Sequence, residues 1–217
     1  MVERTRHVHA RARHDARRAA RLEHRTARRE ELVEAAVRVI RRDGPGASME
    51  KIAAEAGVTK PILYRFFDDR EGLGQAVAEQ FATSLLAELQ TSLSTGGGPR
   101  ELLAGTVDTY LAFIERDPNV YRFLVHGSHA SAQSELAGFI RRVGQEVSLA
   151  VGEQLRAAGL DSGAAEPWAY GLVGMVHLAG DWWLDRRPMP RARLVEYLTT
   201  LVWDGLAATG VGGDATP

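Results

Sequence analysis

The residues best suited to recognise another molecule lie within residues 48–67, which read SMEKIAAEAGVTKPILYRFF. Apolar residues recur there at the spacing of two short helices, which Gly57 separates. Four polar side chains are left facing outward from the second helix: Thr59, Lys60, Tyr64 and Arg65. Hydroxyl, ammonium and guanidinium groups suit the hydrogen-bonding edges of base pairs and the phosphates beside them. The segment therefore predicts a helix-turn-helix whose second helix enters the major groove of duplex DNA.

An ordinary helical hairpin is the alternative for this segment, because short helices joined at a glycine are common. Here the motif follows an amphipathic helix that residues 43–46 (DGPG) terminate, and Ser48 is placed to cap the next helix. Pro61 falls in the first turn of the last helix, where its missing N–H costs little. This combination favours the DNA-binding interpretation.

The other potentially reactive groups do not form a catalytic or metal-binding set. His126 and His129 are three residues apart, but no further metal ligand is apparent, so helix capping or ordinary hydrogen bonding is expected. His177 and Asp181 are four residues apart and are expected to pair along one helix. No nucleophile or electrophilic stabiliser accompanies them, and the chain contains no cysteine. We expect neither enzyme activity, nor a metal, nor a cofactor.

These residues are expected to be carried by an all-α fold, because no convincing alternating strand pattern occurs along the chain. A first helix is predicted from about Thr26 to Arg42, a second over 49–56, a third to Phe67 and a fourth over about 70–94. Five more helices are predicted at about 100–116, 120–131, 134–158, 165–186 and 190–209. Three units follow: an arm of residues 1–25, a DNA-binding head of residues 26–70 and a helical body of residues 71–217.

Charge is divided unevenly along the chain. Residues 1–70 contain 17 basic and 11 acidic side chains, whereas residues 71–217 contain 10 and 17. Ten arginines lie in residues 1–29, where large apolar residues are almost absent. We expect a mobile basic arm, which either contacts DNA phosphates or the minor groove, or is a solvated tail.

Residues 28–73 resemble the DNA-binding domain of TetR-type transcriptional regulators, through the segments EAAVRVI, SMEKIAAEAGVTKPILYRFF and DDREGL. The resemblance implies an all-helical homodimer, usually a repressor, with a three-helix head on a palindromic operator and a larger body that binds a small-molecule inducer. It places Thr59, Lys60, Pro61 and Arg65 at the bases and Tyr64 on a phosphate. Ser48 and Arg70 complete the expected DNA-facing set, whereas Phe66 replaces a histidine that many members have, so no contact is assigned to it.

The middle helices of the body contain an aromatic-rich apolar set that suits an effector cavity. The set consists of Phe81, Leu85, Tyr110, Phe113, Ile114, Tyr121, Phe123, Phe139 and Val143. Plain core packing is the alternative for each of them. The segments YLAFIERDPNVYRFLVHG and GLVGMVHLAGDWWLDRRP resemble actinobacterial TetR-type regulators of lipid metabolism, some of which respond to fatty acyl-CoA. A hydrophobic effector follows from this resemblance, with a long-chain acyl-CoA as the first candidate. Arg122, Arg141 and Arg142 either meet an anionic headgroup or lie on the surface.

The last two long helices are the expected dimer interface, and core packing within one protomer is the alternative. The interface set consists of Leu172, Met175, Val176, Trp183, Leu198, Leu201 and Val202. No secretory signal is visible, and the apolar stretch Trp168 to Leu184 is too short for a bilayer, so a cytoplasmic protein with no membrane partner is expected. A second hypothesis is a DNA-binding regulator without a small-molecule effector, controlled by a protein partner or by its own abundance.

Overall fold

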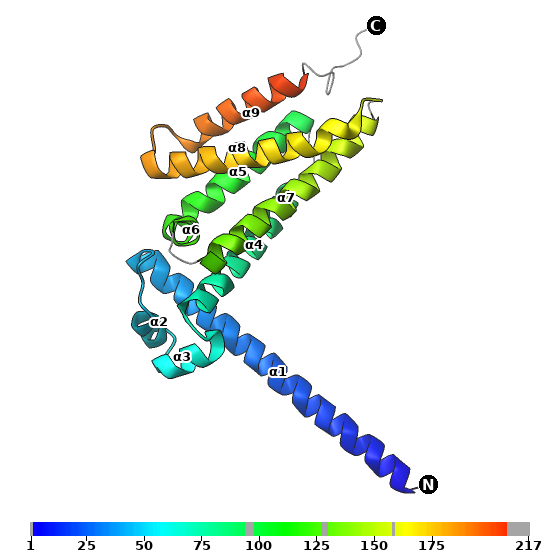
Figure 1. The fold of residues 1–217 in the computed structure, drawn as a ribbon, viewed down its shortest axis with the longest axis vertical. Helices are drawn as coiled ribbons and strands as arrows, with labels where there is room; N and C mark the ends of the chain where they lie inside the picture. Colours follow the sequence, from blue (N-terminus) through cyan, green and yellow to red (C-terminus); the bar gives the residue numbers. More distant parts are fainter. Residues whose placement is uncertain (1, 94–97, 127–129, 158, 208–217) are drawn as a thin grey trace.

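The computed structural model describes residues 2–93, 98–126, 130–157 and 159–207, and over these residues the secondary structure is helical with no strand. The elements are α1 (Val2–Asp43), α2 (Met49–Glu55), α3 (Lys60–Phe67), α4 (Arg70–Leu93), α5 (Pro99–Arg116), α6 (Pro118–Val125), α7 (Ala130–Ala157), a 3₁₀ turn (Ser162–Ala164), α8 (Ala165–Arg186) and α9 (Arg191–Ala207). The all-α prediction is confirmed. Figure 1 shows a long rod, α1, that carries a small head of α2 and α3 and ends against a bundle of the remaining helices.

Helix α1 differs most from the sequence-based expectation, because it begins at Val2 rather than near Thr26 and continues unbroken to Asp43. The residues expected to form a mobile arm are therefore helical. The composition of residues 1–25 predicted disorder because they have little apolar surface to bury. Arginine and alanine, however, have high intrinsic helix propensity, which does not depend on burial. Gly44 ends the helix with a φ of 86°, a left-handed conformation that glycine adopts without strain.

The head is held by local caps and a small apolar core. The hydroxyl of Ser48 accepts the backbone N–H of Lys51 at 3.4 Å and caps α2, as predicted. Gly57, with a φ of 65°, makes the turn between α2 and α3. A carboxylate oxygen of Asp69 accepts the N–H of Gly72 at 2.7 Å at the start of α4. Each cap satisfies a backbone N–H that would otherwise lack a partner, so the local sequence fixes where these helices begin.

The body is a bundle in which α7 packs against α4 and α8, and α5 packs against α4, α8 and α9. Helices α5 and α8 approach closely at Gly180, where an added methyl group would lie 3.0 Å from a ring carbon of Tyr110. Among the helices that the structure describes, none is both long and apolar enough to span a membrane.

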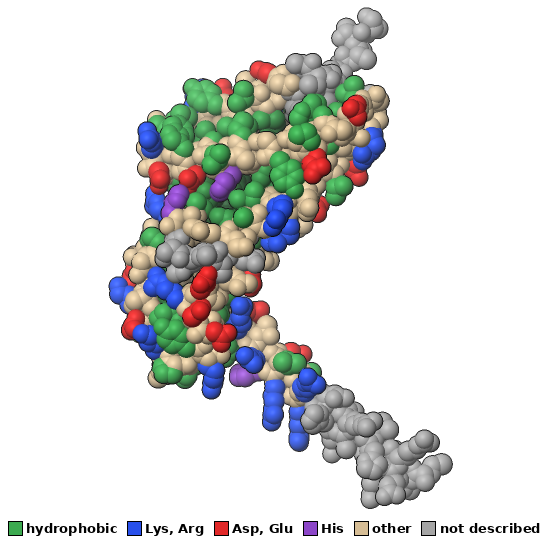
Figure 2. All heavy atoms as spheres, in the orientation of Figure 1, with side chains coloured by type: hydrophobic (Ala, Val, Ile, Leu, Met, Phe, Trp, Pro, Cys, Tyr) green, Lys and Arg blue, Asp and Glu red, His purple; other side chains and the backbone are tan. Residues whose placement is uncertain are grey.

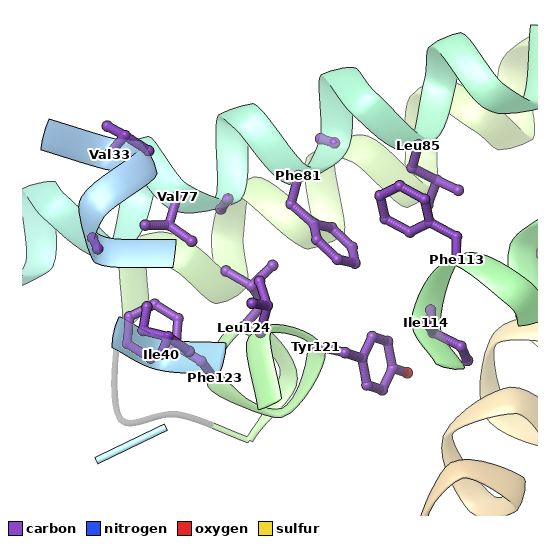
Figure 3. Close-up of a cluster of buried hydrophobic side chains, with 14 of the residues drawn as sticks. Val33, Ile40, Val77, Phe81, Leu85, Phe113, Ile114, Tyr121, Phe123 and Leu124 are labelled. Atoms are coloured by element: carbon purple, nitrogen blue, oxygen red, sulfur yellow. The ribbon is translucent and has the colours of Figure 1, made fainter. Parts of the chain in front are cut away.

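Helix α6 connects the body to the head through polar and apolar contacts with α1. The guanidinium of Arg41 donates to both carboxylate oxygens of Asp117, at 2.5 and 2.7 Å, and the side-chain amide of Asn119 donates to the backbone carbonyl of Arg41 at 2.8 Å. Phe123 lies beside Ile40 in the buried cluster that joins the two parts (Figure 3). A two-point guanidinium–carboxylate contact fixes orientation as well as distance, so α6 and the end of α1 are held in register.

Candidate nucleic-acid interface and body cavity

Helix α3 presents the predicted recognition residues on its outer side. Leu63 and Phe67 are buried against the head, and this anchoring turns the opposite face outward. Thr59, Pro61 and Arg65 are exposed, and Lys60 and Tyr64 are half-buried. Ser48 is half-buried at its capping position, and Arg70 is half-buried at the first residue of α4. Their contacts with DNA stay a prediction.

Lys60 is held in place by a carboxylate that the sequence analysis did not single out. Its ammonium group forms an ion pair with Glu50 of α2 and lies 5.8 Å from the ring centre of Tyr64. The hydrogen bond with Glu50 raises the pKa of Lys60, and the same bond lowers the pKa of the Glu50 carboxyl. A phosphate or base edge that takes Lys60 must therefore compete with Glu50. No local pattern reveals a pair ten residues apart, because it depends on how α2 and α3 cross.

Other cations of the head are also neutralised by carboxylates. Asp43 accepts from Arg42 at 2.8 Å and lies 2.8 Å from the ammonium of Lys51. Glu55 joins Arg38 at 3.1 Å and Arg42 at 3.0 Å. The hydrogen bond from Arg42 lowers the pKa of Asp43, and those from Arg38 and Arg42 lower the pKa of Glu55. The head itself therefore offers little net positive charge to DNA.

The surplus positive charge lies on α1. Arg17, Arg21, Arg25 and Arg28 follow one another at spacings of three or four residues, which places them on one helix face. Arg25 and Arg28 also line a surface groove between α1 and α3, together with His24, Val58, Ile62, Arg65 and Phe66. Basic side chains project from this part of α1 in Figure 2. The structure thus places Arg25 and Arg28 beside the recognition helix, on the same helix face as Arg17 and Arg21.

A cavity of about 100 Å³ lies within the body, between α4, α5, α7 and α8. It is lined by Leu85, Leu89, Leu103, Thr106, Val107, Tyr110, Phe139, Ile140, Val143, Val147, Leu172, Val173, Val176 and His177. Four of the residues predicted for an effector cavity are in this lining: Leu85, Tyr110, Phe139 and Val143. The lining is almost wholly apolar, which suits a hydrophobic ligand.

The other five residues predicted for the cavity are buried outside its lining. Phe81 and Phe113 pack edge to face with ring centres 4.7 Å apart, and Ile114 is fully buried. Tyr121 and Phe123 belong to α6, and Phe123 lies toward α1 in Figure 3. Helical periodicity shows that a side chain points inward, but it does not distinguish a packed core from a cavity.

The surface of the cavity is apolar, but one stretch of its wall contains side chains that carry polar groups. The hydroxyl of Tyr110 and Nδ1 of His177 lie 3.0 Å apart, and the ring of Tyr121 packs edge to face on His177 with centres 6.3 Å apart. Asp181 lies 3.0 Å from Nε2 of His126, so His177 and Asp181 each have a hydrogen-bond partner on another segment, although the charge of Asp181 still acts on the His177 ring. His129 lies outside the described residues, and no group of three potential metal ligands occurs within them.

Burial controls the charge of this wall. It raises the pKa of both Tyr110 and Tyr121 and lowers the pKa of His177, so all three groups are neutral near pH 7. The hydroxyl of Tyr121 is buried with no hydrogen-bond partner among the residues that the structure describes. The polar groups of Tyr110, Tyr121 and His177 are therefore uncharged.

Helices α8 and α9 expose a different apolar set from the one predicted for the dimer interface. Trp183 is 1% exposed and its indole N–H donates to the carbonyl of Met189 at 2.9 Å, and Leu198 is also buried. Leu172 and Val176 line the cavity, Met175 packs against the core, and Val202 is half-buried. Within this set, Leu201 alone is largely exposed, at 64%. Trp183 and Leu198 are thus buried within the protomer, and the dimer interface itself stays a prediction.

Large exposed apolar side chains nevertheless gather on these two helices. Leu178 and Trp182 on α8 are 68% and 42% exposed, and Tyr197 on α9 is 55% exposed, beside the exposed Leu201. We call these four residues the α8–α9 face. Apolar side chains cover much of the part of the body surface that Figure 2 shows over α8 and α9.

The three arginines considered for an anionic headgroup have different surroundings. Arg122 lies 3.3 Å from the carboxylate of Asp185 and donates to the carbonyl of Leu184. Arg141 and Arg142 are exposed on α7, the helix whose other face lines the cavity through Phe139 and Val143. The arginine side chains are therefore outside the lining itself.

Comparison with known proteins agrees with this architecture. Residues 32–77 match the model of bacterial regulatory proteins of the tetR family, and residues 88–216 match the tetracyclin repressor-like C-terminal domain. The chain is 36% identical over 185 residues to an uncharacterized HTH-type transcriptional regulator of Mycobacterium tuberculosis, covering 85% of this chain and 79% of that protein. It is 30% identical over 183 residues to the HTH-type transcriptional activator FasR of Mycolicibacterium smegmatis, covering 83% of each.

Solved structures share the fold at lower identity. A TetR-like transcriptional regulator from Rhodococcus superposes with a TM-score of 0.61 at 24% identity, covering 83% of this chain and 96% of that one. The transcriptional regulator FadR from Bacillus subtilis, solved in complex with stearoyl-CoA, gives a TM-score of 0.67 at 16% identity, covering 81% of this chain and 98% of that one. The matched family and these relatives are transcriptional regulators and not enzymes. On the domain matches and the sequence identity to its relatives, the chain belongs to the TetR family of bacterial transcriptional regulators.

Proposed function

We propose that the protein is a homodimeric repressor, released from a palindromic operator when a hydrophobic effector enters the cavity between α4, α5, α7 and α8. In this proposal residues 26–70 read the operator, residues 71–217 bind the effector and dimerise, and the basic part of α1 adds affinity. The observation that carries the proposal is the apolar cavity, because one of the helices that line it, α4, also contacts α1 and α3 of the head.

A long-chain acyl-CoA is the proposed effector. The support is the almost wholly apolar lining and the bound stearoyl-CoA in the FadR structure that shares this fold. The cavity of about 100 Å³ is smaller than the roughly 300–1,000 Å³ of drug-sized ligand pockets. An acyl chain therefore has to separate the helices that line the cavity, and this requirement links binding to a change of shape.

The proposed path of that change runs through α4 and α6. Leu85 of α4 lines the cavity, and Val77 of the same helix lies in the buried cluster with Val33 of α1 (Figure 3). Helix α6 is tied to α1 through Arg41 and Asp117. Separating α4 from α7 thus moves the helices that contact α1. The spacing between the two recognition helices of a dimer then changes, and they no longer match successive major grooves.

A second copy of this chain is the proposed partner of the α8–α9 face. Its four exposed apolar residues lie on two long helices that follow each other in the chain, and in an isologous interface the same patch of both copies meets. Leu201→Asp should convert the dimer to a monomer in light scattering coupled to size exclusion. The control is Leu149→Asp, because Leu149 is similarly exposed, at 63%, but belongs to α7 rather than to α8 or α9. A dimer that survives Leu201→Asp would exclude this face as the interface.

The function is tested by an electrophoretic mobility shift with the DNA upstream of the protein's own gene, with and without palmitoyl-CoA. We expect a retarded protein–DNA complex that dissociates when palmitoyl-CoA is added. Palmitoyl-CoA should also raise the melting temperature of the free protein. Free coenzyme A is the control for the headgroup alone. DNA binding that no acyl-CoA changes, together with no thermal stabilisation by any apolar ligand, would favour the alternative, a regulator without an effector. The small volume of the cavity also favours that alternative.

A further inference from the structure

The ion pair between Glu50 and Lys60 places a hydrogen-bond acceptor beside a donor at the start of the recognition helix. Glu50 lies in the first turn of α2, and Lys60 is the first residue of α3. Their side chains are 61% and 43% exposed, so both are accessible from outside the head. If Lys60 reaches a base pair, the carboxylate bonded to its ammonium group lies within reach of the same base pair.

The donors and acceptors of this ion pair match the major-groove edge of a G·C base pair. Lys60 uses one of its three N–H donors on Glu50 and keeps two, and the carboxylate keeps further acceptor sites. Guanine offers two neighbouring acceptors, N7 and O6, and cytosine offers the N4 amino donor beside them. O6 and N4 are joined by a Watson–Crick hydrogen bond, so they are one hydrogen-bond length apart, as are the two members of the ion pair. The ammonium group can therefore bind guanine while the carboxylate accepts from cytosine.

Other base pairs fit the ion pair less well. With adenine in place of guanine and thymine in place of cytosine, the ammonium group meets the N6 amino donor and the carboxylate meets the O4 acceptor. Reversing the G·C pair places the carboxylate against O6 and N7 and the ammonium group against N4. A T·A pair satisfies both members at O4 and N6, but it puts the acceptor N7 of adenine beside the carboxylate. Such unpaired or repelling contacts discriminate between sequences as effectively as attractive ones do.

The charge of Glu50 makes this discrimination stronger. The hydrogen bond from Lys60 lowers the pKa of the Glu50 carboxyl, so at neutral pH this group is an anion that only accepts. A carboxylate near the phosphates opposes binding to any sequence. Arg65, the other cation of α3, is exposed and has no ion-pair or hydrogen-bond partner among the described residues. The unfavourable charge beside Lys60 is therefore offset only at a base pair that donates a hydrogen bond to it.

We propose that Glu50 and Lys60 together read one G·C base pair of the operator half-site, with Lys60 on guanine and Glu50 on the N4 amino group of cytosine. The inference rests on the proposed function, because it assigns a base pair to the helix that reads the operator. A G·C edge removes the competition between Glu50 and DNA for Lys60, because it engages both side chains. A carboxylate that only restrains Lys60 would instead change the affinity for all sequences alike.

The first measurement selects duplexes from a library of random sequence with the full-length protein and with its Glu50→Ala and Lys60→Ala variants. The wild type should enrich a motif with a G·C pair at one position of the half-site, and both variants should lose the preference at that position. Glu55→Ala is the matched control, because Glu55 is a paired carboxylate of the same helix whose partners, Arg38 and Arg42, lie on α1. It should keep the preference at every position. Circular dichroism reports whether each variant is folded.

The second measurement removes single groups from the selected base pair and follows binding by fluorescence anisotropy. The base 2-pyrimidinone, in place of cytosine, lacks the N4 amino group. It should weaken binding of the wild type about 10-fold and binding of Glu50→Ala by less than about 2-fold. The base 7-deazaguanine lacks the N7 acceptor, and it should weaken binding of the wild type but not of Lys60→Ala.

Three results would overturn the inference and leave the proposed function in place. They are a motif whose positions all survive Glu50→Ala, a loss of preference at different positions in the two variants, and an equal effect of 2-pyrimidinone on the wild type and Glu50→Ala. Failure of the wild type to enrich any sequence would overturn both the inference and the reading of an operator in the proposed function. The two failures are therefore distinguishable.

Discussion

The basic face of α1 should supply a measurable part of the affinity for DNA. Arg17, Arg21 and Arg25 are exposed, and their spacing of four residues places them on one side of a helix that runs without interruption into the head. Replacing all three by glutamine removes three positive charges and preserves helix propensity. We expect weaker binding to any duplex and a shallower dependence of that binding on salt.

The size of the effect follows from counterion release. Each cation that neutralises a phosphate adds about 0.9 to the slope of log K against log salt for B-DNA, so three contacts add up to about 2.7 per protomer. Over a fourfold rise in salt, a slope of about 2.7 corresponds to a loss of roughly 40-fold in affinity. For each protomer that contacts the duplex, the triple variant should lose that much less affinity than the wild type between 50 and 200 mM salt.

Fluorescence anisotropy with a labelled duplex of arbitrary sequence measures this slope, because the phosphate term does not depend on base sequence. The control replaces Arg141, Arg142 and Arg156 on α7 by glutamine, which removes the same charge from exposed positions of the body. Circular dichroism checks that α1 stays helical. A triple α1 variant whose slope equals that of the wild type would refute the contact, and a control variant with the same reduced slope would show a mere effect of net charge.

Three further predictions concern the head and the packing of the body. Glu50→Gln should tighten binding in the same titration and steepen its slope by up to about 0.9, because it releases Lys60 for phosphate; an unchanged affinity would show that the ion pair does not restrain Lys60. Gly180→Ala should destabilise the protein by about 1–3 kcal/mol in thermal melting, because the new methyl group meets α5 at 3.0 Å. Gly171→Ala on the same helix, with nothing within 4 Å, should not destabilise it, and equal melting temperatures for the two variants would contradict the close approach. The pKa of the Glu55 carboxyl is lowered from its ordinary value of 4.5, so its ion pairs stabilise the folded protein above pH 4.5. This stabilisation is lost as the pH falls through the lower pKa of the folded state. Melting temperatures measured from pH 7 to pH 3 should show the loss, and Glu55→Gln should make the loss smaller.

Features set by neighbouring residues were predictable from the sequence. Gly57 and the cap at Ser48 determine the turn and the start of α2 within a few residues of chain, and the helix-turn-helix was found from them. The cap at Asp69 and the proline after Asp117 likewise mark where helices begin. Local signals of this kind act before any tertiary contact forms.

Features that depend on how helices cross were not predictable. Tyr110 and Phe113 both point into the body from α5, but only Tyr110 lines the cavity. Tyr110 contacts His177 of α8, whereas Phe113 packs against Phe81 of α4. Trp183 looked like an interface anchor because its size is typical of interfaces, and its burial depends on the chain that folds back through Met189. The helical start of α1 was missed for another reason. The prediction of disorder assumed that a segment must bury apolar surface to fold, but a helix can also be stabilised by its own local interactions.

Because α1 is unbroken, a small rotation at its contact with α6 produces a large displacement near its N-terminus. Its 42 residues extend about 63 Å at about 1.5 Å per residue, and Arg17 lies roughly 36 Å along the axis from Arg41. A tilt of about 5° at Arg41 moves Arg17 by roughly 3 Å, close to the rise of about 3.4 Å per nucleotide along the axis of the duplex. A rotation small enough to leave the core packing intact therefore shifts the basic face by about the rise of one base pair.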